Sequence, residues 1–167
     1  MQTLYSIDSS SGDTKPGEPI VILTKKIEES RQLFTYLIYF ITEVARFSEA
    51  DALQKASKHL PTAGDLSVNT KIAGNEILWK IVEDKNFISA LNEGKLAQKT
   101  DTDLLKKIYV DLINSLEYKE YIELQTRDKK SEKRILEFIF TDLMLPNENF
   151  ISHMEEHFIN WDDDAEM

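Results

Sequence analysis

The stretch His59-Leu-Pro-Thr-Ala-Gly-Asp-Leu-Ser-Val-Asn-Thr-Lys-Ile-Ala-Gly-Asn-Glu-Ile-Leu-Trp79 separates two helical patterns, and the rest of the chain is arranged on either side of it. Pro61 cannot continue a preceding helix, because its ring removes the backbone N–H and clashes with the turn before it. Gly64-Asp65 indicates a turn, and Asn69-Thr70 predicts a helix cap. We therefore expect a loop here, between one long helix and a second helix over residues 70–83.

The segment before this loop, residues 20–58, has apolar residues at spacings of three and four, which is the period of an amphipathic helix. The expected inward stripe comprises Leu23, Ile27, Phe34, Leu37, Ile41, Val44, Ala52 and Ala56, and a second stripe beside it comprises Leu33, Tyr36 and Phe40. At about 1.5 Å per residue this helix would extend for about 58 Å, which exceeds the width of a compact domain. A bend or break is therefore expected near Phe47–Asp51, where Ser48 is placed to cap a new helix.

After the loop, helical patterns continue to the end of the chain. Further helices are expected over residues 84–91, after Thr100-Asp-Thr-Asp103, which resembles a capping box, over 118–124, over 128–145, and after Asn147. No alternating apolar–polar run bounded by turns is found. The sequence therefore predicts an all-α protein, an irregular helical bundle of about six to seven helices.

Composition suggests one domain and narrows the functional classes. The chain has 167 residues, 41% of them apolar, and a formal net charge of −10, which argues against a non-specific nucleic-acid binder. The absence of cysteine excludes disulfides and thiol catalysis and fits a cytoplasmic location. The most apolar segment, Leu33–Ile41, is too short to span a bilayer. Residues 1–19 are expected to be the end of a basic helix plus a linker rich in Ser, Gly and Pro, and residues 20–167 a single helical domain.

Two motifs carry possible chemistry. His153-Met-Glu-Glu-His157 has the spacing of a zinc-peptidase motif, in which two histidines one helical turn apart hold the metal and the glutamate acts as base. A third protein ligand is not evident, so the favoured interpretation is two surface histidines whose protonated forms are stabilised by adjacent acids, with a small zinc-dependent hydrolase as the alternative. Asp162-Asp-Asp164 is expected to be a solvated acidic tail. No phosphate loop and no Gly-x-Ser-x-Gly elbow occurs, so we expect no enzyme, no cofactor and no small-molecule substrate.

A basic cluster begins the helix expected over 128–145, formed by Arg127, Lys129, Lys130, Lys133 and Arg134. Two like-charge pairs at i,i+4 and cations at a helix N-terminus are mildly unfavourable, which a binding partner could explain. Asp128 and Glu132 interleave with these residues, so a solvated face remains the simpler interpretation.

The chain resembles the NusB family of bacterial transcription antitermination factors, in the extra helical segment of its longer members. The matching residues are Met1-Gln-Thr-Leu-Tyr-Ser6, Leu60-Pro-Thr62, Asp65-Leu66, Asn69-Thr70, Tyr118-Lys119, Tyr121, Asn147-Glu148, Glu155-Glu156, Trp161 and Asp163-Asp164. Met1–Ser6 looks like the Val-Gln-x-Leu-Tyr-Ser that ends the first helix of the family.

The resemblance implies a function for the longer protein to which such a segment belongs. Family members bind boxA leader RNA together with the ribosomal protein NusE and help polymerase pass terminators. The resemblance places Gln2 and Tyr5 near RNA, the arginine-rich RNA-binding segment before Tyr5, and the second helical half after Met167. The chain is thus expected to be mostly the insert, a non-catalytic segment that makes protein–protein or RNA contacts or separates the flanking halves.

Overall fold

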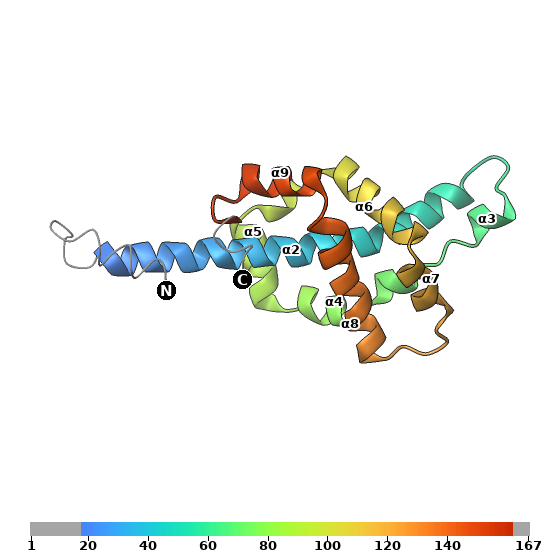
Figure 1. Cartoon of the computed structure of the whole chain (residues 1–167), viewed down its shortest axis with the longest axis horizontal. Coiled ribbons are helices and arrows are strands. Elements are labelled where there is room, and N and C mark those ends of the chain that lie inside the picture. Colours follow the sequence, from blue (N-terminus) through green and yellow to red (C-terminus); the bar gives the residue numbers. More distant parts are fainter. Residues whose placement is uncertain (1–17, 162–167) are drawn as a thin grey trace.

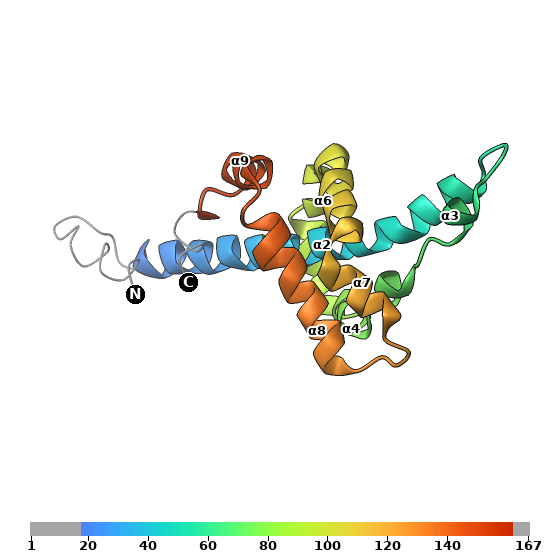
Figure 2. The same cartoon turned by 45° about the vertical axis from the view of Figure 1, so that its right-hand side comes forward.

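The computed structural model describes residues 18–161 and shows an all-α protein, as the sequence predicts. Within these residues there are eight α-helices, two 3-10 turns and one π-helical turn. The longest helix, α2 (Glu18–Ala56), crosses the whole molecule in Figure 1, and the other elements are arranged around it. Seven of the helices correspond to expected ones, and the eighth is the short α3 (Ala63–Leu66) inside the expected loop. The first turns of α2 stand clear of the other described helices in both Figure 1 and Figure 2.

Helix α2 is continuous, so the break expected near Phe47–Asp51 is wrong. Ser48 is fully buried, and its hydroxyl donates to the carbonyl of Ala45 inside the helix rather than capping a new one. Asp51 accepts a hydrogen bond from the Tyr109 hydroxyl at 3.1 Å and pairs with Lys55 at 2.7 Å. The two residues expected to restart a helix therefore stabilise the existing one, and the length of α2 is accommodated by its projecting end.

The buried side of α2 is mainly the stripe expected to be secondary. Leu33, Tyr36 and Phe40 are 2% exposed or less, and they lie in the hydrophobic core with residues of the later helices. In contrast, Ile27 is 61% exposed and Phe34 is 51% exposed, so the expected inward position of both residues is wrong. The residues that point inward are selected by where the other helices pack, which the apolar period alone does not specify.

The expected loop is more structured than the sequence predicts. Thr62 caps α3 through a capping box with Asp65, and Lys58 also pairs with Asp65 at 2.6 Å. The helix expected over residues 70–83 is divided into a 3-10 turn, η1 (Lys71–Gly74), and helix α4 (Glu76–Val82).

The cap of α4 is Asn75 and not Asn69-Thr70, because the buried Asn75 side chain accepts from the N–H groups of Ile77 and Leu78. Its side-chain amide also donates to the carbonyl of Glu132 at 3.1 Å. A long-range contact therefore fixes the helix start.

The next elements pack against α2. They are α5 (Lys85–Glu93), the 3-10 turn η2 (Leu96–Lys99) and α6 (Thr102–Asn114), and α6 makes the most extensive contact with α2. Asp101, not Thr100, caps α6 by accepting from two backbone N–H groups. This part of the chain completes the core on one side of α2.

The chain ends with α7 (Leu116–Glu123), α8 (Lys129–Phe138), the π-helical turn η3 (Ile139–Met144) and α9 (Glu148–His157). Helix α8 and η3 follow each other without a break, which matches the single helix expected over 128–145. Asn147 caps α9 as predicted, accepting from two N–H groups of its first turn. Helices α7 and α8 lie side by side as a hairpin, and α4 also packs against α8 (Figures 1 and 2).

Candidate functional site

The five cations of the basic cluster are not equivalent in the structure. Arg127 turns away from the others and donates to the carbonyls of Lys71, at 2.8 Å, and Gly74. A Cβ at Gly74 would lie 2.9 Å from the Arg127 guanidinium, so a larger residue there would require the arginine side chain to shift. Arg127 therefore holds η1 against the start of α8, and its role in the cluster is structural.

Glu132 is buried, which corrects the expectation that it solvates the basic face. Its side chain is 2% exposed, and its carboxylate accepts from the Tyr121 hydroxyl at 2.9 Å and from the N–H of Glu76 at 3.2 Å. Arg127 lies 3.7 Å away on the same carboxylate. Burial next to this carboxylate raises the pKa of the Tyr121 hydroxyl. Glu132 thus joins α8 to α7 and α4 as a buried, hydrogen-bonded group.

Lys71 completes this closed network from the opposite side. Its ammonium donates to the carbonyl of Tyr121 at 2.6 Å and to that of Leu124 at 2.8 Å, and it lies 4.5 Å from the Tyr121 ring. These carbonyls belong to the end of α7, where helical acceptors have no partner within the helix. Burial lowers the pKa of Lys71. The end of α7 is therefore held by a positive charge.

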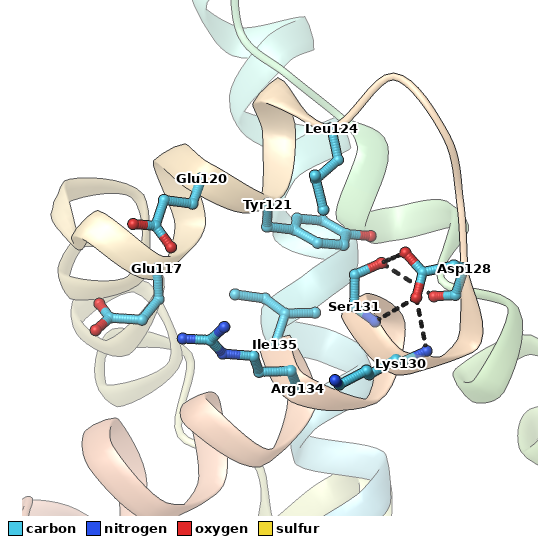
Figure 3. A pocket seen from close by; sticks show the side chains of 9 residues that line it. All are labelled: Glu117, Glu120, Tyr121, Leu124, Asp128, Lys130, Ser131, Arg134 and Ile135. Carbon is cyan, nitrogen blue, oxygen red and sulfur yellow. Dashed lines mark hydrogen bonds between the residues drawn. The ribbon is translucent and has the colours of Figure 1, made fainter.

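On the outer side of α8, Lys130 and Arg134 line a groove between α7 and α8 (Figure 3). Asp128 caps the helix by accepting from the N–H groups of Lys130 and Ser131, each at 3.0 Å. These hydrogen bonds, with one from the Ser131 hydroxyl, lower the pKa of Asp128. The remaining members of the basic cluster lie elsewhere, since Lys133 pairs with Glu137 at 3.0 Å and Lys129 faces a second hollow toward α4.

The groove has an apolar floor between an acidic wall from α7 and a wall from α8 that carries Lys130 and Arg134 together with the capping carboxylate of Asp128. Its cavity volume is about 250 Å³, and Tyr121, Leu124 and Ile135 form the floor. Helix α7 contributes the carboxylates of Glu117 and Glu120 on the wall across from Lys130 and Arg134, as Figure 3 shows. Within residues 18–161 these four side chains make no ion pair with one another or with other residues.

The sequence analysis identified the basic wall and missed the acidic one. The available signal was Glu117 and Glu120 three residues apart, which places both carboxylates on one face of a helix. That face could be recognised as a wall only once α7 was known to fold back beside α8. The groove is thus a tertiary feature built from two segments whose separate patterns are ordinary.

The motif His153–His157 does not form two surface histidines. His153 is 9% exposed, and its Nε2 lies 2.6 Å from the Tyr36 hydroxyl, a hydrogen bond between α9 and α2. Its ring packs edge-on against that of His157, with ring centres 4.6 Å apart. Burial lowers the pKa of His153, which is opposite to the expected stabilisation of the protonated form. Nε2 of His153 is thus used to fasten α9 to α2, which leaves only the other ring nitrogen of this histidine for a metal.

The structure bears on the expectations about metal sites and membrane helices only within residues 18–161. In residues 18–161 no group of three or more His, Cys, Asp or Glu side chains is placed to hold a metal ion, and no helix has the length and apolar content needed to cross a membrane. Gln2, Tyr5 and Asp162–Asp164 lie outside the described residues.

Comparisons with known proteins add no relative. The chain matches no protein-family model, no curated protein and no solved structure.

Proposed function

We propose that this chain is a non-catalytic helical segment of a NusB-like transcription antitermination protein, and that it contributes protein–protein contacts through the α7–α8 groove. The observation that supports this proposal best is an apolar floor flanked by four charged side chains that have no ion-pair partner in the described residues. Groups of this kind are typical of a surface that binds another protein. The longer protein would act in the cytoplasm with boxA-type RNA and a NusE-like ribosomal protein.

The charge of the groove favours a protein over RNA as the molecule bound there. Phosphate affinity comes from cations that release counterions, and it is opposed by carboxylates nearby. Glu117 and Glu120 face the two cations across the groove, and Arg127 is held by backbone carbonyls. The cationic patch that the sequence predicts is therefore smaller in the structure, and one wall of the groove would repel a nucleic-acid backbone.

The test uses the longer protein that contains this segment, with the double substitution K130E/R134E. We expect terminator read-through in a reconstituted transcription assay to fall by about five- to thirty-fold, since each of the two lost charged contacts contributes about 0.5–1 kcal/mol. The matched control is K85E/K107E, which changes the net charge equally at exposed positions outside the groove. Unchanged read-through in the groove variant would contradict the proposal.

RNA binding by the same proteins separates the two kinds of contact. If the groove binds protein, the slope of log affinity for boxA-type RNA against log salt concentration will be the same in wild type and K130E/R134E. A slope reduced by about 0.7 for each lost phosphate contact would mean that the groove binds RNA, and the protein-contact proposal would be wrong.

A further inference from the structure

The two walls of the groove define the chemistry of its partner. We propose that the α7–α8 groove binds a single helix of a partner protein, which carries one large apolar anchor, cations on the flank that faces α7, and carboxylates on the flank that faces α8. This inference rests on the proposed function, because it names the partner of the same groove.

The size of the cavity indicates a single anchor. Pockets that enclose a whole small-molecule ligand usually measure about 300–1,000 Å³. The groove cavity, at about 250 Å³, is smaller than this range and is floored by one aromatic and two aliphatic side chains, Tyr121, Leu124 and Ile135. One aromatic or long aliphatic side chain is the largest group that such a space accommodates, and a central buried anchor is the usual source of interface affinity.

The charges on each wall indicate the two flanks. Glu117 and Glu120 are three residues apart on α7, and Lys130 and Arg134 are four apart on α8, so each pair places like charges on one helix face. Lys130 also lies in the first turn of α8, where the helix dipole disfavours a cation. A partner with cations against α7 and carboxylates against α8 would offset all three unfavourable terms.

The period of the wall charges also favours a helix over an extended strand. Their spacing of three and four residues matches the spacing of side chains along a helix that lies between α7 and α8. A peptide that binds by strand addition would instead need an exposed sheet edge for its backbone hydrogen bonds, and residues 18–161 contain no strand. Turning the partner helix end for end exchanges its two flanks. The two walls therefore also set the direction in which the helix binds.

Three 15-residue peptides test the proposal, each acetylated and amidated, with one central tryptophan. The polarised peptide has lysine at positions −3 and +1 from the tryptophan and glutamate at −1 and +3, which places the two charges on opposite flanks of a helix. The second peptide has lysine at all four positions and the third has glutamate at all four. Each is titrated into the ¹⁵N-labelled full chain at low salt, and amide shifts report both location and affinity.

For the wild-type chain we expect shifts centred on Tyr121, Leu124 and Ile135, and at least five-fold tighter binding of the polarised peptide than of either single-sign peptide. In K130E/R134E both walls are acidic, so the all-lysine peptide should become the tightest. K85E/K107E should keep the wild-type order, and dispersed spectra verify that each variant is folded. Replacing the tryptophan by alanine should abolish binding.

Three results would overturn the inference: shifts outside the groove, a single-sign peptide that binds wild type as tightly as the polarised one, or an unchanged order in K130E/R134E. These failures are distinguishable from failure of the proposed function. If read-through depends on the groove but the peptides show no charge preference, only the partner chemistry is wrong. If the peptides behave as expected but read-through does not depend on the groove, the antitermination role is wrong.

Discussion

Helix α8 has two sides that treat charge in opposite ways. On the inner side, Glu132 is buried and every strong partner it needs is supplied by Tyr121, Glu76 and Arg127. On the outer side, Lys130 and Arg134 face the groove without an ion pair in the described residues. The role of a charged residue on α8 thus follows from its partners and not from its position in the sequence. Charged residues with internal partners hold the fold, and those without them are available for binding.

The strongest way to break this comparison is to remove the inner carboxylate. Glu132→Ala leaves the Tyr121 hydroxyl and the N–H of Glu76 without their acceptor. We expect the free energy of unfolding to fall by about 2–4 kcal/mol. This is less than the largest losses seen when one partner of a fully buried ion pair is removed, because the Arg127 side chain is 36% exposed and can turn to water. Urea unfolding measures this change.

The matched control for Glu132 is Glu137→Gln, on the same helix. Glu137 is exposed and pairs with Lys133 at the surface, so its loss should change stability by less than about 0.5 kcal/mol. A loss below about 1 kcal/mol in Glu132→Ala would show that the buried network does not hold α4, α7 and α8 together, and the distinction between the two sides of α8 would not stand.

The fold class could be predicted from sequence because helical period and caps are local. The cap at Asn147 and the apolar spacing marked helix positions correctly. The fates of individual residues could not be predicted where a distant segment decides them. Glu132 among cations resembled a solvated acid, and it is buried because Tyr121 and Arg127 meet it from other segments.

The same limit explains the errors on α2 and in the site. Ile27 and Phe34 fit an inward stripe by spacing, yet the later helices pack on the side of Leu33 and Tyr36. The basic wall of the groove could be predicted from adjacent residues. The acidic wall could not, because it depends on how the α7–α8 hairpin closes.

A second buried polar contact, between Tyr36 on α2 and His153 on α9, should make the stability of the fold depend on pH. Burial lowers the pKa of His153 in the folded state, and His157 and Lys99 lower it further against the opposite effects of Asp101 and Glu156. The unfolded chain, with an ordinary histidine pKa of about 6.5, therefore binds the proton more readily. We expect stability to be fully present above about pH 6.5 and to decrease as the pH falls toward 5, an effect smaller than the loss of Glu132 because one imidazole is involved.

The measurement is urea unfolding at pH values from 7.5 to 5 for wild type, His153→Gln and His59→Gln. Glutamine at 153 retains a hydrogen-bonding group for the Tyr36 hydroxyl and cannot titrate, so the decrease in stability should be shallower. His59 is exposed, and its replacement should leave the wild-type slope. A His153→Gln profile as steep as that of wild type would show that this contact is not the proton-sensitive one.

The smallest expected effect belongs to the open side of α8 and has the opposite sign. Lys130→Glu removes a like-charge pair with Arg134 and puts an acid in the first helical turn, where the dipole favours it. The lost attraction between Lys130 and Asp128 offsets part of this gain, so we expect a net stabilisation of about 0.5 kcal/mol at low salt that diminishes at high salt. Lys107→Glu on α6 lies four residues from both Asp103 and Asp111, so it creates two like-charge pairs and should lower stability instead.

A destabilised Lys130→Glu would mean that Lys130 has an internal role after all, and the outer side of α8 would then be structural like the inner one. The expected gain in stability complements the peptide titrations, because reversing Lys130 together with Arg134 should there change which peptide the groove prefers. A cation whose removal stabilises the folded chain is not needed by the fold. Residues that conflict with local helix preferences are expected mainly at binding sites. Lys130 has two such conflicts beside an apolar cavity, a like charge at Arg134 and a place in the first helical turn.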